Sequence, residues 1–553
     1  MPNTLYVGGG KKTKKMKLLA RLVLLAACTL PLAAWAAAHE NAKTVAPVAK
    51  PAAVTAQVKG TLLFVPLDDR PVCKAYTVDA LRAAGWQVEM PPDATISSGN
   101  HGGKPDEIFA WLDKKAPEAI GMVVSADALI YGGLVDSRTH HENPQVLQAR
   151  AARLLNLKNT SGNPNVFAFV TVMRSPHASS APVEPAYYKE WGPKIFRRGQ
   201  LLDKQDMGTL KSKEKDELME LNKAIPAEDL KDLDSRRVVN MNLTRYLLNG
   251  VKQDKLDYLM VGRDDTSTFS QAHMDARHIE TLVNKLPDKK VRFFAGADQL
   301  GLILLDRAVH TLTLQTPFVY AFYAGGKGGN TIPSYEDTVI SDTVKQHILA
   351  AGAYPVTNAK NADLCLGVFT PVNGKTWEAS TVKNDGKITD QETNFTGRVQ
   401  KLLQQRKPVV VADVAFANGS STALTKQIFV ADIAKKLAAY GGWNTASNAM
   451  GLALGQGLLT KYMSQADVQN QLEVRYLEDW GYQAKVRSAV YQELIWPKQL
   501  PGSQMPANVK AEAEAAITAD MLKLTAPVLG NMAEKYQYTL PWERMFEVYV
   551  TKK

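Results

Sequence analysis

The chain contains only three cysteines in 553 residues, Cys28, Cys73 and Cys365. Three cysteines cannot form the disulfide framework of a small secreted domain, and none stands at the spacing from another cysteine or a histidine that a structural zinc site needs. Cys73 and Cys365 could form one disulfide, or they could remain two small buried residues. With 45% hydrophobic residues the chain can instead bury a large core, and its length favours two or more domains.

The sequence motifs of several enzyme classes are also missing. There is no Gly-x-Ser-x-Gly elbow and no dinucleotide-binding glycine fingerprint, so a serine hydrolase of that type or a nicotinamide enzyme has no support. The glycine-rich residues 325–330 lack the Gly-Lys-Ser/Thr ending of a P-loop, and Pro333 interrupts the helix that should follow. We therefore expect no organic cofactor.

Positive charge is concentrated at the start of the chain. The formal net charge is +11, but six Lys and Arg residues precede residue 39 with no acidic residue among them, which leaves 11 − 6 = +5 for the rest. No basic run is interleaved with aromatic residues. This pattern argues against a nucleic-acid partner.

The basic start is followed by features of an export signal. Residues 22–35 are apolar, and the small residues Ala34 and Ala36 precede His39. This predicts a signal peptide over residues 1–38 and a periplasmic or secreted mature protein. The apolar stretch is shorter than the roughly 20 residues that span a membrane, so we expect no integral span in the mature chain. Residues 25–28 also fit a lipoprotein cleavage box, which leaves a lipid anchor through Cys28 as an alternative.

An alternation of apolar runs and helical patterns begins after a flexible stalk predicted over residues 39–60. Such alternation indicates βαβ units and a parallel sheet, hence an α/β fold. The nine predicted strands cover residues 61–67, 86–90, 120–125, 166–172, 257–262, 291–295, 317–322, 363–369 and 408–414.

Helical spacing is clearest in two of the intervening segments. Apolar residues share one face between residues 298 and 310. A second pattern starts at Ser421 with Thr422 as candidate N-cap, continues through Leu437 and stops at Gly441. The charged segment 189–237 is an expected excursion with helices of its own, the polar segment 373–394 an expected solvated loop, and a last helix is expected around 511–524.

These elements predict two Rossmann-like lobes around a cleft, over residues 61–315 and 316–490, followed by a helical extension over 491–553. Nine strands are one too many for a simple eight-stranded barrel. A single TIM-barrel-like domain with the same extension remains the alternative.

Polar residues follow six of the predicted strands, and two of these ends carry a carboxylate pair, Asp68-Asp69 and Asp264-Asp265. In a parallel sheet these strand ends share one edge, so carboxylates far apart in sequence can face one ligand. An Asp after a strand can also simply cap the next helix. The other strand ends carry Asp127, Arg174, Asp298 and Asp413.

The carboxylate pairs suggest acid/base chemistry. Adjacent carboxylates repel, so one can stay protonated near neutral pH while the other is ionised. The catalytic candidates are Asp69, Asp264, Asp265 and Asp298. Because successive residues of a strand point to opposite faces, only one member of each pair need face the ligand, and Asp69 and Asp264 are the preferred members. A divalent cation could instead neutralise the cluster, because Mg²⁺ and Ca²⁺ prefer oxygen ligands.

Further residues are candidates for binding a small-molecule or glycan substrate. Arg138 follows the glycines 132 and 133 and offers a fork for an anion, and His101 and His177 lie in loops after strands. Trp443 with Asn444 and Asn448 combines an apolar face with amide donors and acceptors, as sugar binding requires. The complete set of binding candidates is Asp68, Arg70, His101, Asp127, Arg138, Arg174, Arg263, Asp413, Asn418, Trp443, Asn444 and Asn448.

Several linked motifs resemble one bacterial family. Residues 65–71 (VPLDDRP), 131–134 (YGGL), 263–267 (RDDTS), 296–298 (GAD), 412–419 and 442–445 (GWNT) are similar to the family called domain of unknown function 4127, from about residue 61 to 490. The resemblance implies no settled activity. It implies Gln where this chain has Arg263 and Glu where it has Gln299, so a catalytic role is not carried over to residue 299.

The preferred function from the sequence is an exported hydrolase of carbohydrate or cell-envelope glycan that uses carboxylate acid/base catalysis. One alternative is a periplasmic solute-binding protein, in which two lobes close on a ligand without reaction. Another is a metal-dependent hydrolase of phosphoesters or amides. Two carboxyl groups roughly 5 to 10 Å apart in a cleft would favour the glycosidase, whereas a pocket with every carboxylate salt-bridged would favour the binding protein.

Overall fold

The computed structural model describes residues 60–160, 162–178, 182–286 and 290–553. The predicted signal peptide, with its alternative lipid anchor at Cys28, and the predicted stalk up to residue 59 lie outside the described residues. Within the described part, no helix combines the length and apolar character needed to cross a membrane.

The first sheet contains six parallel strands in the order β2-β1-β3-β4-β5-β6. Five of the strands carry at least three fully buried residues each, as expected for a sheet covered on both faces. Their bounds are β1 Thr61–Val65, β2 Gln87–Glu89, β3 Ala119–Ser125, β4 Asn165–Val172, β5 Tyr258–Arg263 and β6 Val291–Ala295.

The second sheet contains five parallel strands in the order β13-β11-β9-β7-β8. The strand order of this sheet matches that of the first sheet. Strand β8 lies on one side of β7, as β2 lies on one side of β1, and the later strands follow on the other side. This is the flavodoxin-like order, in which ligands bind at the carboxyl ends of the strands. The bounds are β7 Phe318–Tyr323, β8 Tyr354–Val356, β9 Leu364–Phe369, β11 Val409–Asp413 and β13 Ala439–Gly441.

The predicted α/β fold with parallel strands in two sheets is confirmed, and all nine predicted strands are present. The alternative of a TIM-like barrel is wrong for the described residues, because their parallel strands form two separate open sheets. The sequence did not reveal β8 and β13, which are only three residues long. Two small sheets complete the set: β10 Trp377–Glu378 with β12 Phe416–Ala417, and β14 Tyr536–Thr539 with β15 Tyr549–Lys552.

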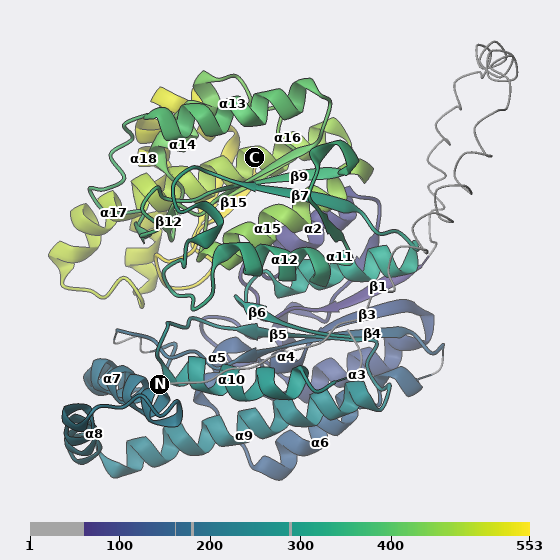
Figure 1. Ribbon diagram of the computed structural model, residues 1–553, viewed down its shortest axis with the longest axis vertical. Helices are drawn as coiled ribbons and strands as arrows, with labels where there is room; N and C mark the ends of the chain where they lie inside the picture. The colour runs from purple at the N-terminus through teal and green to yellow at the C-terminus, as the bar shows by residue number, and fades with distance from the viewer. Residues whose placement is uncertain (1–59, 161, 179–181, 287–289) are drawn as a thin grey trace, which may run out of the picture. The chain divides into compact units, whose positions relative to one another are not determined.

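Helices lie between the two sheets and on their outer faces (Figure 1). The inner helices are α2 Ala75–Ala83, α11 Leu300–Leu312, α12 Ile340–Ala350 and α15 Ala446–Leu459; those on the outer face of the first sheet are α3 Pro105–Lys115, α4 Ala126–Ile130, α6 Pro144–Leu155, α9 Ala227–Lys252 and α10 Gln271–Val283. Helices α13 Asp390–Gln404 and α16 Gln465–Arg475 contact the second sheet. The others are α5 Leu134–Thr139, α7 Tyr188–Asp206, α8 Ser212–Ala224, α14 Thr422–Val430, α17 Arg487–Val490 and α18 Ala507–Leu529.

Helices α11 and α15 join the two sheets into one core. One continuous hydrophobic cluster includes Leu62 of β1 and Val410 of β11, and both sheets belong to a single compact unit. The helices approach closely because Gly451 has no Cβ; an added Cβ would lie 2.3 Å from Cγ of Gln299. The shared core fixes the carboxyl edges of the two sheets relative to each other.

The helix predicted from Ser421 to Gly441 is wrong in its second half. Ser421, rather than Thr422, is the N-cap, because its side chain accepts a hydrogen bond from the Leu424 amide. The helix ends at Val430, and Asp432 adopts a left-handed backbone (φ +51°). The amide of Ile433 then bonds to the Ile428 carbonyl, which is the Schellman arrangement at a helix end. The residues up to Gly441 form a turn and then β13.

Other helical predictions are confirmed. The segment 298–310 contains α11, the charged excursion contains α7, α8 and the start of α9, and the last predicted helix is α18. Cys73 and Cys365 are both free and buried, so the alternative of a disulfide between them is wrong.

Candidate active site

A cavity of about 610 Å³, called the central cavity below, opens where the carboxyl ends of both sheets meet. Residues after β1, β3, β4, β5 and β6 line it from the first sheet, and residues after the strands of the second sheet line it from the other side. Its charged and amide-bearing lining residues are Arg70, Arg138, Arg174, Asp264, Asp265, Asp298, Glu378, Asn418, Asn444, Asn448 and Arg544. Nine of these are residues that the sequence singled out.

The Asp298 carboxylate is held on the wall of the cavity by an arginine and an asparagine. Arg70 donates to both of its oxygens, at 2.7 and 3.2 Å, and Asn444 Nδ2 donates at 3.1 Å. Asp68 lies behind Arg70 and accepts from the same guanidinium at 2.8 Å. Asn448 Oδ1 accepts from the Asp298 amide at 3.2 Å, so the start of α15 holds the end of β6 in place.

Asp264 and Asp265 each pair with a different arginine. Asp264 accepts from Arg138, and Asp265 accepts from Arg174 at 2.9 Å. Glu184 bridges the two guanidinium groups from behind. The side chain of Asp264 is 9% exposed and that of Asp265 25%, so Asp265 is the member of the pair more open to the cavity. Burial, and after it the charge of Asp264, raises the pKa of Asp265 to about 6, even though Arg174 opposes the shift.

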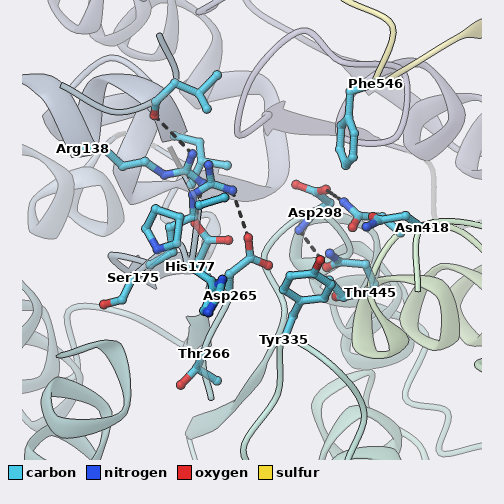
Figure 2. Close-up of a pocket in the computed structure, with 18 of the residues that line it drawn as sticks. Arg138, Ser175, His177, Asp265, Thr266, Asp298, Tyr335, Asn418, Thr445 and Phe546 are labelled. Atoms are coloured by element: carbon cyan, nitrogen blue, oxygen red, sulfur yellow. Dashed lines mark hydrogen bonds and ion pairs between the residues drawn. The ribbon is translucent and has the colours of Figure 1, made fainter. Parts of the chain in front are cut away.

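Glu378 faces the same cavity from the second sheet. Tyr335 donates from its hydroxyl to one carboxylate oxygen at 2.7 Å, and Asn418 Nδ2 donates to the other at 2.9 Å. Both donors have left-handed backbones, with φ +67° for Tyr335 and +58° for Asn418. Backbone strain of this kind concentrates at functional sites. Figure 2 shows Asp265 on one side of the cavity, Asn418 on the other and Tyr335 between them.

Glu378 was not among the sequence candidates. It lies in the polar segment that was expected to be a solvated loop, and its strand β10 has only two residues. Pairing of β10 with β12 places Glu378 beside Ala417, next to Asn418. No local sequence pattern predicts the contact between Glu378 and Asn418, because these residues are 40 positions apart.

The C-terminal segment supplies the aromatic wall of the central cavity, through Trp542 and Phe546. The guanidinium groups of Arg70 and Arg544 both lie over the Trp542 ring, 5.5 and 4.3 Å from its centroid. Its indole nitrogen donates to Asp69 at 2.6 Å. The sequence signal for this wall was the cluster of aromatic and arginine residues within positions 542–546.

Three of the candidates lie away from the central cavity. Asp69 and His101 line a separate pocket of about 340 Å³, which also contacts Trp542. Burial raises the pKa of Asp69. Trp443 is 1% exposed and packs with Phe546 at a ring distance of 5.5 Å, so it presents no face to a ligand.

Two other candidates are buried structural carboxylates. Asp127 is fully buried and accepts from the amide and hydroxyl of Thr171 at 2.9 and 3.1 Å. Asp413 accepts from the amide of Ser421 and so supports the start of α14. Burial raises the pKa of each to about 7.

Arg263, the remaining candidate besides Asp68, links the two sheets beside the cavity. Its guanidinium pairs with Asp337 at 3.1 Å, and Thr266 Oγ1 donates to the same carboxylate at 3.1 Å. The Thr266 amide also bonds to the Tyr335 carbonyl at 2.9 Å. These bonds tie the loop after β5 to the loop after β7, so the cavity walls are held together by the chain itself.

The described side chains of this site do not form a recognisable set of metal ligands. Across the residues that the structure describes, no three or more His, Cys, Asp or Glu side chains are grouped to hold a metal ion. The divalent cation considered from the sequence is therefore given no site.

In comparison with protein-family models, residues 62–551 match the family described as "Protein of unknown function (DUF4127)". The match confirms the resemblance seen in the sequence motifs and extends it beyond residue 490, so it includes the aromatic wall at Trp542 and Phe546. No curated protein matches the chain.

Proposed function

The chain belongs to the DUF4127 family, whose description assigns no activity, and from its site we propose an exported hydrolase of carbohydrate or cell-envelope glycan. The cleavage is carried out by a carboxylate pair, Asp265 from the first sheet and Glu378 from the second. This assignment replaces Asp69 and Asp264, the pair preferred from the sequence.

The observation that carries the proposal is the placement of these two carboxyl groups in one cavity with different environments. Asp265 has a pKa raised to about 6, so it can deliver a proton to the leaving oxygen of a glycosidic bond. Glu378 accepts hydrogen bonds from Tyr335 and Asn418 and is oriented to act as base or nucleophile at the anomeric carbon. The anomeric configuration of the product decides between these two roles of Glu378.

The remainder of the cavity suits a sugar. The rings of Trp542 and Phe546 offer apolar faces, and the amides of Asn418, Asn444 and Asn448 offer donors and acceptors. Asn418 Oδ1 is buried and has no hydrogen-bond partner among the described residues, so it is available to a ligand hydroxyl. A volume of about 610 Å³ accommodates an oligosaccharide segment.

A solute-binding protein is the second candidate, and one observation favours it. Asp264, Asp265 and Asp298 each pair with an arginine, which is what a site that binds without reaction would show. A solute-binding protein closes its lobes about a hinge. Here the shared core and the bond from Thr266 to Tyr335 hold the cavity walls together, which argues against such closure. Glu378 also has no ion pair within the described part of the chain.

The test is hydrolysis of aryl glycosides and envelope glycans by the mature protein and by three variants. Asp265→Asn and Glu378→Gln should each lose turnover by roughly 100-fold or more. Asp69→Asn is the matched control, because that carboxylate lies in the other pocket and the asparagine oxygen can still accept from the Trp542 indole nitrogen; it should retain turnover. No turnover by folded wild-type protein, combined with thermal stabilisation by a saccharide, would favour the binding protein.

A further inference from the structure

A second cavity adjoins the first and extends the site. It has a volume of about 560 Å³ and shares Arg174, Val183, Arg544 and Phe546 with the central cavity. Arg487 of α17 is one of its lining residues. A ligand longer than one sugar can therefore continue from the central cavity into this space, which we call the arginine groove.

The chemistry of the arginine groove differs from that of the central cavity. Its charged lining residues are the three arginines Arg174, Arg487 and Arg544, and no Asp or Glu is among its described lining residues. The neutral polar lining includes the hydroxyls of Ser380 and Ser488. A groove with three guanidinium groups and hydroxyl donors is suited to an oxyanion.

Arg487 is the arginine of the groove that has no ion pair among the described residues, and Glu378 and Glu547 act on its charge only from beyond ion-pair distance. Arg174 pairs with Glu184 and Asp265, and Arg544 pairs with Glu547. Across the described residues, by contrast, no carboxylate lies within 4.0 Å of Arg487. Its Nη1 instead donates to Gln483 Oε1 at 2.7 Å.

The position of Arg487 is fixed although it has no ion pair among the described residues. The guanidinium packs over Phe546 at 5.5 Å from the ring centroid, and the bond to Gln483 holds one edge. Burial lowers the pKa of Arg487, and the nearby charges of Glu378 and Glu547 oppose that shift only in part. A bound anion would supply an ion-pair partner and use the remaining guanidinium edge.

We propose that the arginine groove binds an anionic group, carboxylate or phosphate, of the saccharide, and hence that the ligand is an acidic glycan. That the ligand is a saccharide rests on the proposed function. The groove by itself indicates only that the ligand carries an anionic group. Arg487 provides specificity, and the cleaved bond lies between Asp265 and Glu378 in the adjoining cavity.

The experiment is calorimetric titration of the mature Glu378→Gln variant, in which turnover is blocked. The probes are trigalacturonate for a carboxylate, glucose 6-phosphate for a phosphate and maltotriose as the neutral saccharide. Adding Arg487→Gln should weaken binding of the preferred anionic probe by about tenfold or more and leave maltotriose unchanged. Arg487→Lys should restore only part of the affinity, because an ammonium group lacks the planar fork.

Arg406→Gln is the matched control, since it removes the same charge from an exposed position before β11, at the opposite edge of the sheet. It should change no affinity. Tighter binding of either anionic probe than of maltotriose, lost with Arg487, supports the proposal and identifies the anion. Equal affinity for all probes, no binding of either anion, or no effect of Arg487→Gln in a folded variant overturns it. Because binding is measured without turnover, these results stand whether or not wild-type protein hydrolyses a glycan.

Discussion

Asn418 donates a hydrogen bond to Glu378 at 2.9 Å while its own backbone is held at φ +58°. Asn tolerates this left-handed conformation better than most residues, but Gly adopts it without cost. Asn418→Gly should therefore leave the free energy of unfolding within about 1 kcal/mol of wild type and reduce kcat by roughly tenfold or more, because Glu378 loses a positioning donor. Glycoside turnover and urea unfolding measure the two effects.

The matched control for this substitution is Asn163→Gly. Asn163 also has a positive φ, of +45°, but it is exposed just before β4, at the edge of the sheet away from the cavity. It should leave kcat unchanged. A similar loss of kcat in both variants would mean that Asn418 acts through general backbone rigidity rather than through Glu378.

The pH dependence of turnover follows from Asp265. A general acid must be protonated, so kcat/KM should fall as pH rises above about 6, the pKa of Asp265 in the free protein. Removing the neighbouring charge with Asp264→Asn should lower that pKa, since Asp264 is the second cause of its elevation after burial. The alkaline limb of the pH profile of kcat/KM should then move to lower pH. An unchanged limb in an active Asp264→Asn variant would remove Asp265 from the role of acid.

A separate pH effect concerns stability and arises from Asp127. Its pKa is raised from the model-compound value of 3.8 to about 7 in the folded protein, chiefly by burial. The folded state therefore holds a proton that the unfolded state releases between about pH 4 and pH 7. The resulting stabilisation is complete below pH 4 and is lost as pH rises through 7.

Asp127→Asn should remove this dependence while keeping acceptor contact with Thr171. The variant should unfold at higher urea concentration than wild type at pH 8, and the difference should shrink at pH 4. The readout is the difference between the two proteins at each pH, because Asp413 also has a raised pKa and titrates in both. An equal difference at pH 4 and pH 8 would show that the Asp127 carboxyl is not protonated in the fold.

The strands were predictable because their signal is local. An apolar run such as that of β1 or β9 is buried on both faces, so its residues must be apolar wherever the neighbouring strands lie. The β13 strand was not predictable, because Ile433 and Leu437 continue the helical spacing of α14. The left-handed turn at Asp432 that ends the helix has no strong residue signal, since the sequence there has Asp rather than Gly.

The same distinction applies to the candidate site. Asp264, Asp265 and Asp298 were identifiable because the topology of a parallel sheet gathers its strand ends at one edge. Glu378 and Trp542 reach the cavity through contacts between distant segments, β10 with β12 and the C-terminal segment with Arg70. Such contacts depend on how the sheets pack. The aromatic and arginine cluster at positions 542–546 marks the C-terminal segment as unusual, but nothing in it indicates which part of the fold it contacts.

The ion pair between Arg263 and Asp337 should be a main link between the two sheets beside the cavity. The Asp337 side chain is 1% exposed, so Arg263→Gln leaves a buried carboxylate with hydroxyl donors only. We expect a loss of roughly 3 kcal/mol in the free energy of unfolding. Adding Asp337→Asn should recover at least half of that loss, because it removes the unpaired charge. Additive effects of the two substitutions in a double-mutant cycle would show that the pair is not coupled.

The crossing of α11 and α15 gives the sharpest test of how the two sheets are joined. A Cβ on Gly451 would lie 2.3 Å from Cγ of Gln299, which is fully buried and bonded to the Ala295 carbonyl and to His347. Gln299 cannot move without breaking those contacts, so Gly451→Ala should destabilise the fold by roughly 1–3 kcal/mol. Gly397→Ala in α13 is the same substitution in an open position, with no atom within 4 Å of the added Cβ. It should stabilise by roughly 0.5–1 kcal/mol through helix propensity. Urea unfolding of both variants should therefore give changes of opposite sign, and a common sign would mean that the helices do not cross at the distance that joins the two sheets into one core.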